Sequence, residues 1–186
     1  MRVLAFAAST SRNSINRQLL DHAIRVLTTD IAPDVEVETI DLIDYEMPIF
    51  SVDREAEDGI PQEAHDLFAK IGASDAVLVS FAEHNGYYTA AYKNTFDWMS
   101  RIDIKVYQGK PTVMLATSPG PRGGRNVLKT AVTSAPFFGN DVRGELSVPS
   151  FGDNFEAGAL VESDHIDALA AALTALVAPA GTSDTA

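Results

Sequence analysis

Short apolar segments alternate with segments of helical pattern along this chain, and the alternation limits the folds open to it. Residues 76–81 (Ala-Val-Leu-Val-Ser-Phe) form an almost continuous apolar run, which is typical of a strand buried on both faces. Residues 19–27 instead carry leucine, isoleucine and alanine at helical spacing. Because strands joined by helical crossovers lie parallel, the alternation predicts an α/β fold with helices on both faces of a parallel sheet.

The alternation repeats five times, and this sets the expected topology. We expect strands at residues 3–8, 35–40, 76–81, 111–117 and 142–148, and helices that begin near residues 15, 61, 90, 126 and 164. A doubly wound sheet of this size predicts the strand order 2-1-3-4-5. The segment 35–40 alternates apolar with acidic residues, which indicates a strand with one exposed face or at a sheet edge.

The chain shows no internal repeat, linker or composition shift that would divide it. The sequence therefore predicts a single domain over residues 1–178, followed by a small, polar and frayed tail at 179–186. Residues 42–58 are irregular and rich in acidic side chains, and they predict a long surface loop that is solvated through 53–58.

Charge and composition exclude several classes of function. The chain has 186 residues and a formal net charge of −12, from 14 basic and 26 acidic side chains, which argues against nucleic acid or an anionic membrane as partner. There is no cysteine, so disulfides and thiolate chemistry are excluded, and the four histidines lack the spacing of metal ligands. No signal peptide or membrane-length apolar run is visible, so we expect a cytoplasmic protein.

The segment Ser9-Thr10-Ser11-Arg12-Asn13-Ser14-Ile15-Asn16 joins the first strand to the first helix. Free backbone N–H groups and the helix dipole make this place suitable for a phosphate, and the hydroxyls and Asn16 add possible donors. Because the chain as a whole is acidic, Arg12 and Arg17 are candidates for local neutralisation of an anion. The alternative is an ordinary turn in which Ser or Asn caps the helix.

Two further loops follow strands that neighbour the first strand in the expected order. Residues 82–88 (Ala-Glu-His-Asn-Gly-Tyr-Tyr) follow the third strand, and residues 118–125 (Ser-Pro-Gly-Pro-Arg-Gly-Gly-Arg) follow the fourth. Both loops allow tight turns and close approach of a ligand, and Gly123-Gly124 offers consecutive N–H groups to a planar heterocycle. The alternative for each loop is a turn that serves only the path of the chain.

These three motifs resemble those of the flavodoxin-like NAD(P)H-dependent FMN reductases, which include azo-dye, quinone and chromate reductases. The first motif is Ser9-x-Ser11-x-x-Ser14-x-Asn16, and the second is residues 82–85 followed by Lys-Asn-Thr-Phe-Asp-Trp at 93–98. The third, Ser-Pro-Gly-x-x-Gly-Gly, is complete at residues 118–124. The resemblance runs from residue 1 to about 138 and is looser beyond.

The chain departs from the family pattern at three positions. Ser11 stands where many members have Arg, so charge neutralisation there falls to Arg12 or to backbone amides. Ala82 replaces a Pro, and His84 replaces a Tyr in the loop that lies along the flavin in the family. The histidine either places a titratable group near the ring or points to solvent without effect.

The resemblance implies a bound FMN with its phosphate in the first loop and its ring between the other two. NADPH or NADH would stack on an open face, leave, and be replaced by a small acceptor: a quinone, azo compound, nitroaromatic, metal oxyanion or free flavin. The flavin carries the chemistry, so no catalytic side chain is expected. The implied cofactor contacts are Ser9, Ser11, Arg12, Asn13, Ser14, Ile15, Asn16, Ala82, Glu83, His84, Asn85, Gly86, Ser118, Pro119, Gly120, Arg122, Gly123 and Gly124.

The resemblance also implies a homodimer or homotetramer with the third helix at an interface. Trp98 and Phe96 on that helix are expected in the core or between subunits, and Lys93 with Asp97 is expected to form a local ion pair. Tyr87 and Tyr88 either border the open flavin face or pack between subunits, and Glu83 is alternatively a solvated acid.

Two other functions remain possible for such a chain. One is a non-enzymatic electron carrier like flavodoxin, although the first loop lacks the glycine that such carriers usually have. The other is a binding module that has lost the flavin through the changes at Ala82 and His84. The preferred nucleotide is open as well, with Arg12, Arg122 and Arg125 as candidates for contact with a 2′-phosphate.

Overall fold

A computed structural model describes residues 1–179 of the chain. Its centre is a parallel sheet of five strands in the order β2-β1-β3-β6-β7. The strands are β1 (Arg2–Ala8), β2 (Glu36–Ile40), β3 (Ala76–Phe81), β6 (Pro111–Thr117) and β7 (Asp141–Val148). This confirms the expected order 2-1-3-4-5 and the α/β class. Every residue of β3 is buried, while β2 lies at an edge and is partly exposed, as its alternating pattern indicates.

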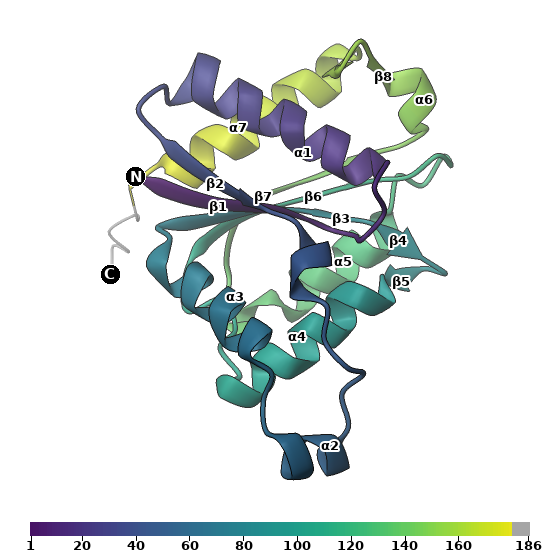
Figure 1. The fold of residues 1–186 in the computed structure, drawn as a ribbon. Helices are drawn as coiled ribbons and strands as arrows, with labels where there is room; N and C mark the ends of the chain where they lie inside the picture. The colour runs from purple at the N-terminus through teal and green to yellow at the C-terminus, as the bar shows by residue number, and fades with distance from the viewer. Residues whose placement is uncertain (180–186) are drawn as a thin grey trace, which may run out of the picture.

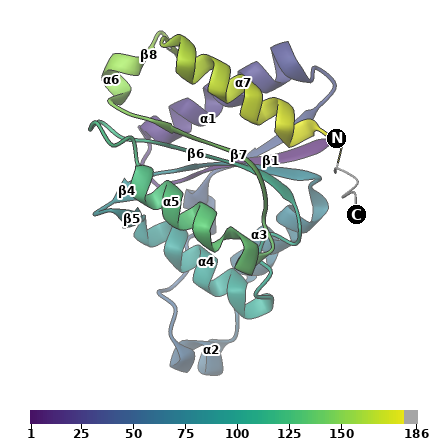
Figure 2. The ribbon, with the colours of Figure 1, turned by 180° about the vertical axis from the view of Figure 1, so that it is seen from behind.

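Helices cover both faces of the sheet (Figure 1). On one face lie α1 (Ile15–Val26), extended by a π-helical turn (Leu27–Ile31), and α7 (Ser163–Val177). On the other lie α3 (Gln62–Ala73), α4 (Ala90–Ile102) and α5 (Arg125–Ser134), as the reverse view in Figure 2 also shows. Because alternate strand residues point to opposite faces, Val77 and Val79 pack in the α3–α5 layer while Leu78 packs in the α1–α7 layer.

The segment 42–58 differs from the long surface loop that the sequence predicts. It contains a 3₁₀ turn (Leu42–Tyr45) and a short helix, α2 (Val52–Asp58), which projects away from the sheet beyond α3 and α4 (Figure 1). Leu42 and Met47 are buried in the core, so the first half of the segment is anchored. The second half matches the prediction of solvation, since all α2 side chains are at least partly exposed.

Two small hairpins, the short helix α6 and a 3₁₀ turn (Ala135–Phe138) after α5 complete the described chain. The predicted loop 82–88 is a hairpin of β4 (Glu83–His84) and β5 (Tyr87–Tyr88), which lies beside α5. After β7, α6 (Phe151–Asn154) leads into a second hairpin of β8 (Phe155–Glu156) and β9 (Ala159–Leu160). Seven α-helices are present among residues 1–179, where the sequence predicted five, because α2 and α6 are too short to show a periodic pattern.

The described helices include none that is both long and apolar enough to cross a bilayer. Apart from Pro179, the tail predicted to fray lies outside the described residues.

Candidate functional site

The three polar loops meet at the carboxyl edge of the sheet, because β1, β3 and β6 are adjacent there. A cavity of about 250 Å³ opens between them. Ten of the eighteen predicted contact residues line it together with Thr117: Ser9, Ser11, Asn13, Ser14, Ile15, Asn16, Ala82, Glu83, Ser118 and Pro119. The remaining predicted residues lie on the same three loops but outside this lining: Arg12, His84, Asn85, Gly86, Gly120, Arg122, Gly123 and Gly124.

The first loop is folded by its own serines. The Ser11 backbone N–H donates to Ser9 Oγ at 3.2 Å, and the Ser14 N–H donates to the Ser11 carbonyl at 3.1 Å. Ser14 caps α1, since its Oγ accepts from the Arg17 N–H at 3.3 Å, so the capping alternative holds for this residue. Within residues 1–179, the backbone N–H groups of Ile15 and Asn16 have no hydrogen-bond partner. The helix therefore presents two free donors beside the cavity.

A second cavity of about 180 Å³ lies on the other side of the same loop, lined in part by Ser9, Ser11, Arg12 and Ser14. Arg17 also borders it, but its guanidinium donates to Asp21 at 2.8 Å. Arg12 has no ion pair within the described chain. Of the two arginines that the sequence nominated to neutralise an anion, Arg12 is therefore the one with a free charge.

The Asn16 side chain joins the start of α1 to the ends of β3 and β6, so its amide is occupied within the protein. Its Oδ1 accepts from the Thr117 N–H at 2.9 Å and from Ser80 Oγ at 3.0 Å, and its Nδ2 donates to the Thr117 carbonyl at 3.1 Å. The residue is 2% exposed. Its backbone N–H remains a phosphate donor candidate, whereas its amide is mainly structural.

Glu83 in the second loop is bonded to α5 and is not a solvated acid. Its carboxylate accepts from the Val127 N–H at 2.9 Å, in the first turn of α5, where the helix dipole favours a negative charge. Asn85 and Gly86 both have positive φ, 54° and 80°, which suits the tight turn of a hairpin. His84 and Asn85 are exposed at this turn, so the histidine that replaces the family tyrosine faces solvent.

Two of the three glycines in the third loop, Gly123 and Gly124, are needed for packing. Gly123 has φ +58°, and a Cβ there would come within 2.7 Å of Val148 C and Pro149 N at the end of β7. Gly124, with φ +72°, is the N-cap of α5, and its Cβ would lie 3.1 Å from Ala116. A Cβ at Gly120 would instead meet no heavy atom of the described chain within 4 Å. Only Gly120 therefore borders open space.

Aromatic side chains fill the space behind the second loop. Tyr88 packs on Phe81 and Tyr92, and the Tyr92 and Tyr107 hydroxyls are 2.8 Å apart. Burial raises the pKa of all three phenols above the usual 10, so these hydroxyls stay protonated at neutral pH. Tyr87 is 47% exposed at the hairpin.

On α4, the polar residues form the expected local ion pair and the aromatic residues pack in the core as expected. Lys93 pairs with Asp97 at 2.6 Å, as i, i+4 spacing predicts. Trp98 is fully buried, and its indole N–H donates to the Pro48 carbonyl at 2.7 Å. Phe96 is partly buried and packs edge-on against Phe138.

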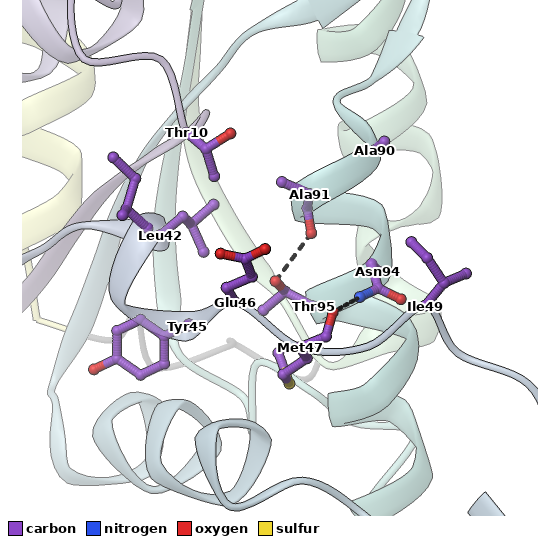
Figure 3. A pocket seen from close by; sticks show the side chains of 11 residues that line it. Thr10, Leu42, Tyr45, Glu46, Met47, Ile49, Ala90, Ala91, Asn94 and Thr95 are labelled. Carbon is purple, nitrogen blue, oxygen red and sulfur yellow. Dashed lines mark hydrogen bonds between the residues drawn. The ribbon is translucent and has the colours of Figure 1, made fainter. Parts of the chain in front are cut away.

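A larger cavity of about 390 Å³, which the sequence did not suggest, lies between residues 42–49 and the first half of α4 (Figure 3). Thr10 of the first loop closes its upper end in this view. The sequence pattern missed it because residues 42–49 were predicted to be a surface loop.

Comparison with known proteins points to the same family as the motifs of the three loops. Residues 1–153 match the model of the NADPH-dependent FMN reductase family. The chain belongs to this family. It is therefore an oxidoreductase of the type that uses FMN and NAD(P)H, as the motifs indicated.

Similar proteins include an uncharacterised protein of Mycoplasma pneumoniae, 28% identical over 160 residues that cover 82% of this chain and 90% of that protein. A quinone reductase of Escherichia coli K12 is 25% identical over 177 residues, 89% of each chain. Among solved structures, FerB of Paracoccus denitrificans, a flavoenzyme NAD(P)H:acceptor oxidoreductase, superposes with a TM-score of 0.73 at 23% identity over 94% of both chains. The last likeness supports the fold.

The donor set of the loops fits FMN. The hydroxyls of Ser9 and Ser11 and the free N–H groups of Ile15 and Asn16 lie at the cavity between the three loops and suit a phosphate, and Arg12 on the same loop adds a positive charge nearby. The same cavity reaches the second and third loops, where a further part of the molecule would lie.

Proposed function

We propose that this protein reduces a small acceptor, a quinone or azo compound in the first instance, with electrons that FMN carries from NAD(P)H. The observation that carries the proposal is the meeting of three loops around one cavity, beside the free N–H groups of Ile15 and Asn16. FMN, when bound, accepts a hydride and passes two electrons on, and the protein residues supply placement and electrostatics.

The first loop is the proposed phosphate site. The Ile15 and Asn16 N–H groups and the hydroxyls of Ser9 and Ser11 would donate to phosphate oxygens, while Arg12 supplies the positive charge that the acidic chain otherwise lacks. Ser14 holds the loop in place as the cap of α1. Ser11 therefore contributes a hydroxyl where many relatives contribute a guanidinium.

The second and third loops are the proposed walls for the flavin ring. Ala82, Ser118 and Pro119 line the shared cavity, and the Glu83 bond to Val127 fixes one wall against the other. Since the Glu83 carboxylate is bonded within the protein and His84 faces solvent, neither is placed as a proton donor. We therefore propose that the protons of the reaction come from solvent.

The same proposal extends to assembly and compartment. We infer a homodimer or homotetramer in the cytoplasm, where reduced nicotinamide nucleotides are supplied. Sedimentation analysis of the purified chain measures the oligomeric state directly. A monomer at micromolar concentration would contradict the inferred homodimer or homotetramer.

The deciding experiment is an anaerobic absorbance titration of the purified protein with one equivalent of FMN, before and after NADPH. Flavin that stays with the protein on filtration and bleaches rapidly with NADPH is the expected result. Retained flavin that neither NADPH nor NADH bleaches would indicate an electron carrier. A protein that retains no FMN and reduces none would indicate a binding module.

A further inference from the structure

Residues 149–160, which include α6 and the hairpin β8–β9, form a segment between β7 and α7 that we call the connecting segment. Figures 1 and 2 show α6 and β8 on the side of the sheet that α1 and α7 cover. At its start, the Ser150 N–H donates to the Gly120 carbonyl at 2.9 Å, and the Phe151 N–H donates to the Ser118 carbonyl at 3.0 Å. The connecting segment therefore holds the third loop, whose Ser118 lines the cavity between the three loops.

The far part of the connecting segment packs on α1. The Arg25 guanidinium donates to the Gly158 carbonyl at 3.0 Å, and the His22 ring packs edge-on against Phe155, with ring centroids 5.9 Å apart. Phe155 in turn stacks on Phe151 with centroids 4.6 Å apart. Because α1 begins at the first loop, the connecting segment links the helix of the proposed phosphate site to the loop that forms a proposed wall for the flavin ring.

His22 is the part of this contact that a proton can change. The residue is 8% exposed, and its Nδ1 is buried without a hydrogen-bond partner in the part of the chain that the structure describes. A neutral imidazole can carry its proton on Nε2 and leave Nδ1 as an unpaired acceptor. A protonated imidazole carries a donor on both nitrogens, so a charge and an unpaired N–H would be buried beside Phe155. The contact therefore favours neutral His22.

The surroundings of His22 set the pH range of this effect. Burial lowers the pKa of His22 below the usual 6.5, Arg25 lowers it further, and Asp30 acts in the opposite direction. The other titratable groups on the connecting segment and the first turns of α7 are Asp153, Glu156, Glu162, Asp164, His165 and Asp167. Because the contact lowers the pKa, the stability that it gives is complete above pH 6.5 and is lost progressively as the pH falls below that value.

We propose that His22 is a positioning residue for the flavin: in its neutral form it holds the connecting segment on α1, and through this segment it holds the third loop where the ring would lie. The inference rests on the proposed function. Protonation favours an arrangement in which the connecting segment leaves α1, and FMN then binds only the fraction of molecules in which the segment is seated. FMN affinity therefore falls in acid through a residue that lies outside both cavities of the first loop.

The test compares FMN affinity at about pH 8 and about pH 5.5 in the wild type and in His22→Phe, which keeps an aromatic ring but takes up no proton. Fluorescence titration should show the dissociation constant of the wild type rising at least about threefold more than that of His22→Phe. His65→Phe, an exposed change on α3, should keep the wild-type response. If the larger ring of His22→Phe prevents folding, His22→Gln gives the same comparison.

Riboflavin separates the third loop from the phosphate site. The phosphate of FMN itself titrates near pH 6, whereas riboflavin has no phosphate. The difference between the wild type and His22→Phe should therefore appear with riboflavin as well as with FMN. A difference that appears with FMN alone would place the effect at the phosphate and overturn the inference.

A second measurement needs no flavin. Hydrogen exchange followed by mass spectrometry, corrected for its intrinsic pH dependence, should show residues 149–160 losing protection at about pH 5.5 in the wild type but not in His22→Phe. Strand β3, buried at every residue, is the internal reference. Phe155→Leu should cause the same loss at about pH 8 and weaken FMN binding at least about threefold, because it removes the aromatic contact. Phe137→Leu, at a side chain that is 72% exposed, should do neither.

The outcomes separate this inference from the proposed function. An equal acid response of FMN affinity in the wild type and in His22→Phe would overturn the inference and leave the proposed function intact. An acid response that disappears in His84→Gln instead would assign it to the second loop, which also overturns the inference. A protein that binds FMN at neither pH would overturn the proposed function, and with it the role of His22 toward the flavin, even if residues 149–160 lose protection in acid.

Discussion

The first and third loops share one edge of the sheet, but they use their small and polar residues differently. The first loop folds on its serines and leaves the N–H groups of Ile15 and Asn16 free beside a cavity. The third loop has the glycine-rich pattern usually associated with ligand approach, yet Gly123 and Gly124 are fixed by neighbouring backbone and side chains. A hydroxyl-rich helix start is therefore the better indicator of binding here, and a glycine pair is the better indicator of packing.

The largest expected effect is at Gly123. An alanine Cβ would come within 2.7 Å of Pro149 N and Val148 C, in a backbone with φ +58°. We expect Gly123→Ala to lower the free energy of unfolding by about 3 kcal/mol, from strain and overpacking. Gly120→Ala is the matched control, and in urea unfolding it should cost less than about 0.5 kcal/mol. Equal losses in the two variants would contradict the packing role.

Asn16 gives the next largest effect and tests whether its amide is structural. Asn16→Ala removes the bonds to Ser80 and Thr117 and leaves buried polar groups without partners. We expect a loss of about 2 kcal/mol in the free energy of unfolding. Asn13→Ala, an exposed change on the same loop, should leave unfolding unaltered in the same experiment. If Asn13→Ala proves as costly, the distinction between the two amides is wrong.

Ser14 caps α1 and also lies in the proposed phosphate site, so one position tests both roles of the first loop. Ser14→Ala removes the side-chain cap of α1 and should cost about 1 kcal/mol, which Ser14→Asp should largely restore. The added carboxylate of Ser14→Asp should nevertheless weaken FMN binding by repelling the phosphate. Thermal unfolding and FMN titration of both variants check this, and tight FMN binding by Ser14→Asp would place the phosphate elsewhere.

Arg12 gives the smallest effect on folding and the most specific effect on binding. Arg12→Gln should change the free energy of unfolding by less than about 0.5 kcal/mol, since the side chain is exposed. Its affinity for FMN should fall about tenfold while its affinity for riboflavin, which has no phosphate, stays the same. Lys129→Gln, an exposed change on α5, is the control for net charge. A parallel loss of riboflavin binding would argue against a phosphate contact.

The sequence was sufficient to predict the sheet, because the apolar runs and helical spacing of this chain are local signals. It was also sufficient to predict which loops converge, because adjacent parallel strands end at one edge. The segment 42–58 was predicted less well, since its first half packs on α4, a helix about fifty residues away in the chain. Asn94 of that helix bonds to the Met47 carbonyl and Trp98 bonds to the Pro48 carbonyl.

Within the candidate site, the sequence predicted where the side chains lie better than it predicted their hydrogen-bond partners. Asn16 and Glu83 both line the cavity as expected, but their polar atoms bind groups 101 and 44 residues away in the chain. Such partners depend on the packed fold and leave no pattern in the sequence. Ser14 was predictable in both respects because its partner is three residues away.

The hydrogen bond between Glu83 and Val127 has a consequence for anyone who exchanges loops among relatives of this protein. It joins the hairpin β4–β5 to the start of α5, so the second loop and the helix that follows the third loop are held against each other. A graft of residues 82–88 alone would bring a carboxylate without its matched helix, or a helix without its carboxylate. Chimeras should therefore transfer residues 82–88 and 118–127 together, as a single cassette.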